Sequence, residues 1–180
     1  YSFCKTPVSV KIEAQSLTVP AIEQTYYEVD RRSKVEVLCR LIDLQEIRFG
    51  IIFCATRMMV DELSEQLNAR GYSTDKLHGD MSQPKRTETL ERFKANEIQL
   101  LVASDVAARG LDIANLSHVF NFDVPIHPED YVHRIGRTGR AGREGRAFTL
   151  ATPEDGKLVD AIVKLIGKEI PRIEIAGIEQ

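Results

Sequence analysis

Short, continuously apolar runs alternate along this chain with segments in which apolar side chains recur at helical spacing. The apolar runs lie at 50–54, 100–103, 118–122 and 146–150, with a weaker one at 72–76. The helical spacing is found at 31–47, 56–70, 82–93, 129–135 and from residue 153 onwards. Apolar runs of this length suit strands that are buried on both faces. The alternation therefore predicts an α/β fold, a three-layer α/β/α sandwich with a mainly parallel sheet.

The N-terminal segment lacks this pattern. Apolar and polar side chains alternate only weakly from 6 to 18, with Pro7 inside this stretch and Pro20 shortly after it. We expect residues 1–21 to be an inter-domain linker or an edge strand from a missing N-terminal domain. Residues 22–180 are expected to form one compact domain. Because the chain does not open with methionine, we interpret it as a fragment of a longer protein.

Charge is distributed unevenly along the chain. The formal net charge is -3, yet residues 133–146 hold five arginines and one acid, Glu144, a local charge of +4 that leaves -7 on the remainder. A basic cluster on an acidic body indicates a directed site for an anion, not a diffuse coat that binds nucleic acid everywhere.

The cysteines and histidines indicate neither disulfides nor a metal. The three cysteines are far apart, no Cys-x-x-Cys occurs, and the four histidines lack metal-ligand spacing. We predict reduced thiols and no metal site in the chain itself. No apolar run approaches membrane-spanning length and no signal-peptide profile is present, so we expect a cytoplasmic protein.

The segment "HRIGRTGR" at 133–140 is the first candidate for chemistry. Arginine binds phosphate through two hydrogen bonds at once and can stabilise the charge of a phosphoryl-transfer transition state. Arg137 and Arg140 lie three residues apart and can project to the same side of a turn. The alternative is a solvated loop that binds phosphates indiscriminately.

Polar side chains follow the predicted strands, where ligands collect in open α/β sheets. Thr56 and Arg57 come after the strand at 50–54, and the segment "SDVAARGLDI" at 104–113 comes after the next. In that second segment Ser104 offers a hydroxyl. Asp105 and Arg109 lie four apart on a short predicted helix, so they could pair with each other instead of binding a ligand.

The segment "LHGDMSQPKR" at 77–86 is the third candidate. Gly79 exposes a backbone amide, and Gln83 and Arg86 share one face of a predicted helix that Ser82 caps. This face could contact a nucleic-acid backbone, or it could simply be a solvated polar face.

Taken together and in this order, the segments resemble the C-terminal RecA-like domain of DEAD-box RNA helicases in superfamily 2. The segments that carry the resemblance are "IIFCATR", "LHGDMSQPKR", "SDVAARGLDI" and "YVHRIGRTGRAGREG". The resemblance covers about residues 22–175 and implies a RecA-like fold. In this family the active ATPase forms when two RecA-like domains close over ATP and a single strand of RNA. The implied partners are therefore an N-terminal RecA-like domain of the same polypeptide and RNA.

The resemblance also implies roles for individual residues. Arg137 and Arg140 would be arginine fingers on the γ-phosphate, His133 would couple nucleotide to RNA at the domain seam, and Asp112 would contact the ATP ribose. The residues implied to contact the RNA backbone are Thr56, Arg57, Gly79, Arg86, Ser104 and Gly110. The arginines with other expected roles are Arg134 and Arg109, for internal bracing, and Arg143 and Arg146, for solvent or loose RNA contact.

Two departures from the family pattern concern the RNA contacts. The family often has threonine where Ser104 stands, and this change keeps the hydroxyl. A polar residue often precedes the threonine where this chain has Cys54 and Ala55, which argues against contacts by residue 55 itself.

The chain contains no Gly-x-x-x-x-Gly-Lys-Ser/Thr and no Asp-Glu-Ala-Asp. The loop that cradles ATP and the acid that holds Mg²⁺ would therefore come from the missing domain. We expect the chain alone to be inactive as an ATPase. Contacts of the family type go to phosphates and 2′-hydroxyls, which carry little sequence information.

Two rival functions remain open from the sequence. One is a free-standing RNA-binding module, which the acidic remainder of the chain argues against. The other is a related superfamily 2 enzyme that acts on DNA, which would more often carry glutamine near the place of His133. A dinucleotide-binding loop is excluded, because Gly136, Gly139 and Gly142 are evenly spaced by three and precede a predicted strand.

Overall fold

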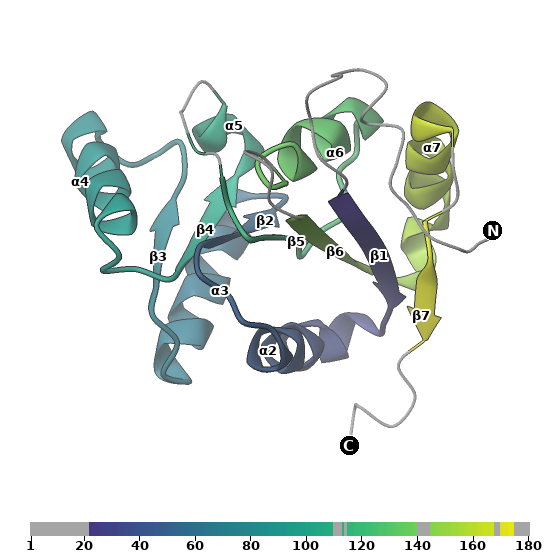
Figure 1. Cartoon of the computed structure of the whole chain (residues 1–180), viewed down its shortest axis with the longest axis horizontal. Helices are drawn as coiled ribbons and strands as arrows, with labels where there is room; N and C mark the ends of the chain where they lie inside the picture. Colours follow the sequence, from purple (N-terminus) through teal and green to yellow (C-terminus); the bar gives the residue numbers. More distant parts are fainter. Residues whose placement is uncertain (1–21, 110–112, 114, 140–144, 168–169, 175–180) are drawn as a thin grey trace.

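A computed structural model describes residues 22–109, 113, 115–139, 145–167 and 170–174. In this part of the chain, seven strands form one sheet in the order β3-β4-β2-β5-β6-β1-β7, and every neighbouring pair is parallel (Figure 1). The strands are β1 (Ile22–Glu28), β2 (Gly50–Cys54), β3 (Thr74–Leu77), β4 (Leu100–Ser104), β5 (His118–Asn121), β6 (Gly145–Ala151) and β7 (Arg172–Glu174).

Helices cover both faces of the sheet, as the sequence predicts (Figure 1). They are α2 (Lys34–Leu44), α3 (Arg57–Ala69), α4 (Gln83–Lys94), α5 (Asp105–Ala108), α6 (Pro128–Ile135) and α7 (Gly156–Ile166). Short 3-10 helices at Arg31–Ser33 and Pro153–Asp155 precede α2 and α7. Helices α2 and α3 pack on one face, while α4, α5, α6 and α7 pack on the other.

Strand β2 shows how the apolar runs build two cores. Ile51 and Phe53 point into the core beneath α4 to α7, and Ile52 and Cys54 point into the core beneath α2 and α3. Successive side chains of a strand face opposite ways, so a strand between two helical layers must be apolar at every position. This is why β2 and the first four residues of β4 are continuous apolar runs in the sequence.

Polar side chains begin the helices that follow the strands. The hydroxyl of Thr56 accepts a hydrogen bond from Met59 N at 3.1 Å, and that of Ser82 accepts one from Lys85 N at 3.3 Å. The predicted cap at Ser82 is therefore confirmed. Each cap satisfies an amide that would otherwise lack a partner in the first turn.

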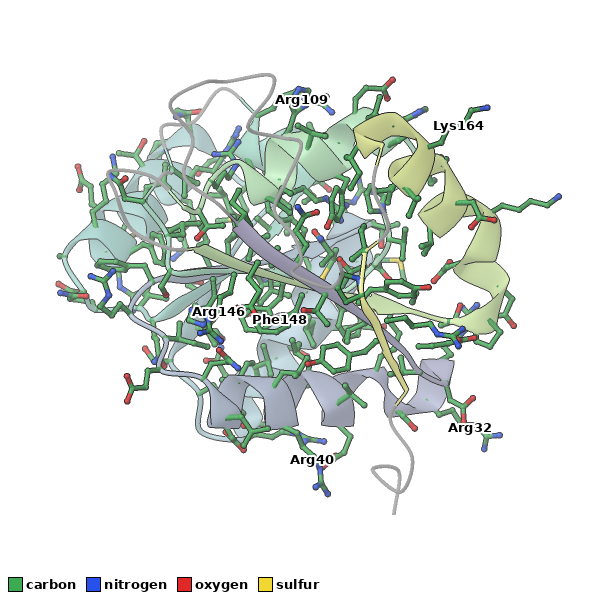
Figure 2. All side chains as sticks on the ribbon, turned by 45° about the vertical axis from the view of Figure 1, so that its right-hand side comes forward. Arg32, Arg40, Arg109, Arg146, Phe148 and Lys164 are labelled. Atoms are coloured by element: carbon green, nitrogen blue, oxygen red, sulfur yellow. The ribbon has the colours of Figure 1, made fainter. Side chains whose placement is uncertain are left out.

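One histidine lies among the aromatic side chains of the α2–α3 core. The ring of His118 stacks on Phe120 and Phe148, with centroids 6.0 and 6.3 Å away, and Phe148 lies in the interior of the molecule (Figure 2). Burial, with Arg146 and Arg48 adding to it, lowers the pKa of His118 to about 4. His118 is the first residue of β5, so it lies at the amino edge of the sheet, away from the carboxyl edge described next.

Strands β1 and β7 are not predicted from the sequence. β1 pairs with β6 along its whole length, from Ile22 beside Gly145 to Glu28 beside Ala151. β7 then pairs with the outer side of β1. The predicted linker at 1–21 lies outside the described residues.

Candidate functional site at the carboxyl edge of the sheet

Four loops that carry the candidate residues leave the same edge of the sheet. All strands are parallel, so their carboxyl ends meet at one edge, and β3, β4, β2 and β5 are successive neighbours there. The loops begin after Cys54, Leu77, Ser104 and Asn121. The fold thus brings together segments that are far apart in the sequence.

Thr56 and Arg57 lie at the exposed start of α3. The guanidinium of Arg57 forms an ion pair with Asp80, which follows β3, at 3.0 Å, with the side chain of Arg57 64% exposed. An exposed pair of this kind contributes at most about 1 kcal/mol. Arg57 therefore connects two loops of the edge and can exchange Asp80 for a phosphate at little cost.

The loop after β3 is held by a buried histidine. The Nδ1 atom of His78 accepts a hydrogen bond from Asp80 N at 3.2 Å, which leaves Nε2 to donate to Asp61 at 3.1 Å. Lys76 lies 2.9 Å from Asp61 and is the main cause that lowers the pKa of that carboxyl, with His78 contributing less. Beside this anchor, Gly79 is exposed, and apart from its two chain neighbours no residue comes within 4 Å of the place where a Cβ would stand. A strand of nucleic acid could therefore approach the backbone closely.

Ser104 and Arg86 make contacts within the protein. The hydroxyl of Ser104 accepts a hydrogen bond from Ala107 N at 3.3 Å and caps α5, and the residue is only 8% exposed. The guanidinium of Arg86 reaches across from α4 and donates to the carbonyl of Ala107 at 3.2 Å. The predicted RNA contacts of these two residues therefore have to coexist with bonds that hold α4 and α5 together.

Arg134 lies at the centre of the edge and is 2% exposed. Its guanidinium donates twice to the carboxylate of Asp105, at 2.8 Å each, and once each to Asn121 Oδ1 at 3.1 Å and the carbonyl of Asp123 at 2.7 Å. It also lies over the ring of Phe53, 5.1 Å from the centroid. The prediction that Arg134 braces the interior is confirmed.

The predicted pairing of Asp105 with Arg109 is wrong. Helix α5 ends at Ala108, and Arg109 has extended backbone angles, so the two side chains do not share a helical face. Arg109 pairs instead with Asp130 at 3.5 Å, and its side chain is 64% exposed at the outer surface of the molecule (Figure 2). Internal bracing by Arg109 is therefore also wrong.

His133 and Arg137 lie on and just beyond α6. His133 is exposed, next to the buried Arg134. Arg137 is half-buried, and its guanidinium donates to the carbonyls of Ala108 at 2.8 Å and Ile113 at 3.1 Å. It therefore holds both ends of the segment that contains the predicted Gly110 and Asp112. Gly110, Asp112, Arg140 and Arg143 themselves lie outside the described residues.

Arg146 differs from the other described arginines of its segment. It is the second residue of β6 and pairs with Glu23 of β1 at 3.5 Å, so it lies at the amino edge of the sheet. Its side chain is 45% exposed. This position agrees with the expected solvent contact.

Asp123 and Lys34 lie at the edge and have no role assigned by sequence. Asp123 bonds to Lys34 Nζ and to Ala55 N, each at 2.8 Å. The signal available in the sequence is the position of Asp123 directly after an apolar strand. Nearby, burial raises the pKa of the Cys54 thiol, and the Asp123 carboxylate adds to the effect, so Cys54 is a packing residue in its protonated form.

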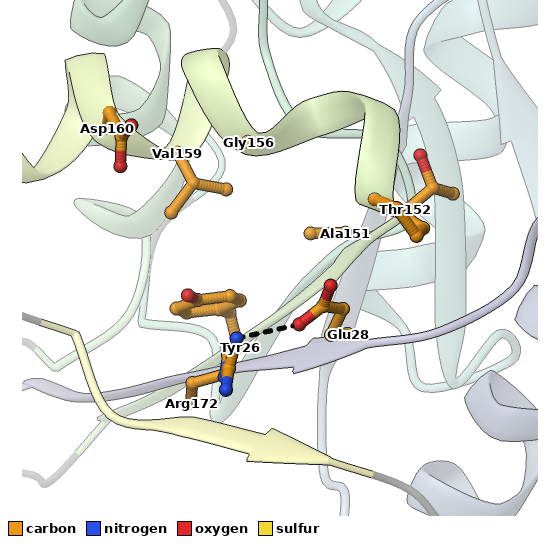
Figure 3. Close-up of a pocket in the computed structure, with 9 residues that line it drawn as sticks. Tyr26, Glu28, Ala151, Thr152, Gly156, Val159, Asp160 and Arg172 are labelled. Carbon is orange, nitrogen blue, oxygen red and sulfur yellow. Dashed lines mark hydrogen bonds and ion pairs between the residues drawn. The ribbon is translucent and has the colours of Figure 1, made fainter.

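A separate pocket of about 220 Å³ lies between β1, β7 and α7, at the side of the sheet that β1 and β7 form and next to the last residues of β1 and β6 (Figure 3). Its lining includes Tyr26, Thr152 and Asp160, and Glu28 pairs with Arg172 beside it at 2.8 Å. None of the candidate site residues lines this pocket.

Two further searches of the described residues concern metals and membranes. Within those ranges, no group of three or more histidine, cysteine or acidic side chains is placed to hold a metal ion. No helix there has the length and apolar character needed to cross a membrane.

Comparison with known proteins identifies the family to which the chain belongs. Residues 33–142 match the helicase conserved C-terminal domain. The DEAD-box ATP-dependent RNA helicase CshA of Bacillus subtilis is 48% identical over 172 residues, which cover 96% of this chain and 35% of that relative. The chain thus spans about a third of the length of such curated relatives.

Solved structures agree with the sequence match. The DEAD-box protein SrmB of E. coli, solved bound to regulator of ribonuclease activity A, has a TM-score of 0.82 and 40% identity, over 87% of this chain and 93% of that one. Dbp5 of S. cerevisiae, solved bound to RNA and ADP BeF3, has a TM-score of 0.79 and 32% identity, over 93% of this chain and 43% of that one. The chain therefore belongs to the helicase conserved C-terminal domain family, as the C-terminal RecA-like domain of a DEAD-box RNA helicase.

Proposed function

We propose that this chain is the half of an ATP-dependent RNA helicase that completes the ATPase site and clamps the RNA backbone. The observation that carries the proposal is the meeting of four polar loops and the arginine-bearing helix α6 at one edge of the sheet. An N-terminal RecA-like domain of the same polypeptide would close against this edge. ATP-driven closure would then remodel or locally unwind RNA.

Arg137 is proposed to contact the γ-phosphate. Among the partners of its guanidinium are two backbone carbonyls, those of Ala108 and Ile113. Hydrogen bonds to a charged phosphate oxygen are roughly twice as strong as bonds to neutral acceptors. A γ-phosphate brought to the edge by the other domain would therefore compete with these carbonyls for the guanidinium. Arg140 would act beside it, and Asp112 would receive the ribose.

The chain would supply positive charge but no nucleotide cradle. The segment that follows helix α6 carries Arg137 and Arg140, whose guanidinium groups suit phosphate oxygens and repel a metal ion. ATP and Mg²⁺ would therefore be bound mainly by the N-terminal domain. The chain alone would not hydrolyse ATP.

The RNA backbone is proposed to lie along the loops after β2, β3 and β4. Exposed Thr56 and Arg57 and the open backbone at Gly79 are the accessible groups there. Ser104, Arg86 and Gly110 would complete the contact, with phosphate and 2′-hydroxyl groups as the ligands. Such contacts are independent of base sequence.

The arginine-finger role is tested by Arg137→Ala in the full-length helicase. Removing an arginine finger lowers turnover on the order of 10³–10⁵-fold, so RNA-stimulated ATPase activity should fall within that range. Arg146→Ala is the matched control, since Arg146 belongs to the same segment but lies at the amino edge of the sheet. Near-normal ATPase activity of the Arg137 variant would refute the role.

A further inference from the structure

The carboxylate of Asp123 is shared between two elements that flank the proposed RNA site. One oxygen lies 2.8 Å from Lys34 Nζ, at the start of α2. The other accepts a hydrogen bond at 2.8 Å from the amide of Ala55, which directly precedes Thr56. A carboxylate can accept at both oxygens, so its position is fixed from both sides.

Lys34 is buried to a degree unusual for a lysine. Its side chain is 9% exposed, and its ammonium group lies 4.5 Å from the centroid of the Phe122 ring. A buried ammonium must be paired, because little water is present to solvate it. Replacing it with an apolar side chain would leave Asp123 with one acceptor unsatisfied and would weaken its hold on Ala55.

Asp123 also connects the loop after β2 to Arg134 of helix α6. The backbone carbonyl of Asp123 accepts from Arg134 at 2.7 Å, and Arg134 in turn holds Asp105, which follows Ser104. A continuous series of charge-assisted hydrogen bonds thus runs from α2 through Asp123 to α6 and α5. A shift of α6 would therefore act on Asp123, and through Asp123 on the loop after β2.

We propose that Lys34 and Asp123 are positioning residues that set the RNA-binding loop 55–57 and couple it to helix α6. The part of this proposal that concerns RNA binding rests on the proposed function. Neither residue needs to touch RNA or nucleotide. Both act through the amide of Ala55, whose hydrogen bond fixes the position of the backbone that leads into Thr56 and Arg57.

The test compares Lys34→Met with the wild type in two measurements. The first is hydrogen exchange of the Ala55 amide, which should become faster on the order of tenfold because its acceptor is less firmly held. The second is the RNA concentration that gives half-maximal ATPase activity in the full-length helicase. It should rise on the order of tenfold, while turnover at saturating RNA changes much less.

Three further variants separate positioning from general destabilisation. Arg92→Met is the matched control, because it breaks the 2.9 Å ion pair between Arg92 and Asp75 of β3. This pair does not involve Asp123 or Ala55, so both measurements should stay unchanged. Lys34→Arg keeps the charge, so the exchange rate and the RNA dependence should both stay near their wild-type values. Asp123→Asn keeps an oxygen for Ala55 and should reproduce the changes in smaller size.

Unchanged exchange at Ala55 in Lys34→Met would overturn the proposal, as would faster exchange with an unaltered RNA dependence. Equal effects from Arg92→Met would also overturn it, because the changes would then follow stability alone. A wild-type helicase without RNA-stimulated ATPase activity would refute the proposed function instead. In that case, faster exchange at Ala55 in Lys34→Met would still support the positioning of the loop.

Discussion

Replacing Arg134 by methionine is expected to destabilise the domain more than any other single removal of charge at the carboxyl edge. The change removes two hydrogen bonds to Asp105 at 2.8 Å and two to oxygens of Asn121 and Asp123. It also leaves the carboxylate of Asp105, only 24% exposed, without its partner. Breaking one side of a buried ion pair costs about 3–5 kcal/mol, and methionine retains part of the packing volume.

For a domain of this size, that loss corresponds to a fall in melting temperature of roughly 10 °C. Calorimetry or urea unfolding of the chain measures it directly. Arg109→Met is the control, because the exposed pair with Asp130 at 3.5 Å should contribute under about 1 kcal/mol. Arg134→Lys should recover only part of the loss, since an ammonium cannot satisfy four acceptors in a plane. Equal losses from the Arg134 and Arg109 variants would refute this reasoning.

Three further predictions concern stability. The lowered pKa of His118, about 4 against an ordinary 6.5, means that the unfolded chain binds a proton that the folded chain does not, so stability should fall by about 3 kcal/mol as the pH drops from 6.5 through 4. Urea unfolding across this range should show a smaller fall for His118→Phe, and parallel losses would contradict the assignment. Ser82→Ala should cost about 1 kcal/mol through the lost cap of α4, and an unchanged unfolding midpoint would count against that cap. Gly145→Ala should cost about 1–3 kcal/mol, because its Cβ would lie closer than 3.0 Å to backbone atoms, whereas Gly156→Ala has open space and should be neutral or stabilising in the same assay.

The interior of the sheet could be predicted because its strands are apolar on both faces. Residues 50–54 were expected as a strand, and β2 has these bounds. β1 was missed because its burial is uneven and includes a polar residue. Gln24 is 3% exposed and accepts a hydrogen bond from the hydroxyl of Tyr131 at 2.8 Å. A partner more than a hundred positions away makes this buried amide tolerable, and no local pattern reveals it.

The segments of the candidate site could be recognised from sequence, but their partners could not. A spacing of four residues predicts that Asp105 pairs with Arg109, but in the structure Asp105 pairs with the buried Arg134. Arg86 looked like a residue of a polar helical face, and the packing of α4 against α5 instead directs it to the carbonyl of Ala107. Contacts of this kind depend on how elements meet in space, which periodicity within one element does not contain.

Asp123 shows the same limit for the coupling network. The position of Asp123 after a strand is visible in the sequence. Its partner Lys34, however, lies 89 positions away, at the start of helix α2 on the face of the sheet opposite to α6. Lysine near the beginning of a helix is ordinarily a solvated residue. Its ion pair with Asp123 and its burial against Phe122 mark Lys34 as part of the edge.

The central claim is that this chain forms half of a split site, and RNA affinity tests it most directly. Binding of a single-stranded RNA should be measured for the chain alone and with a separately produced N-terminal RecA-like domain, each with and without an ATP analogue. Weak binding by the chain alone that tightens sharply only when both the domain and the nucleotide are present is the predicted result. Tight, salt-sensitive binding by the chain alone, indifferent to nucleotide, would contradict the account and indicate a plain RNA anchor.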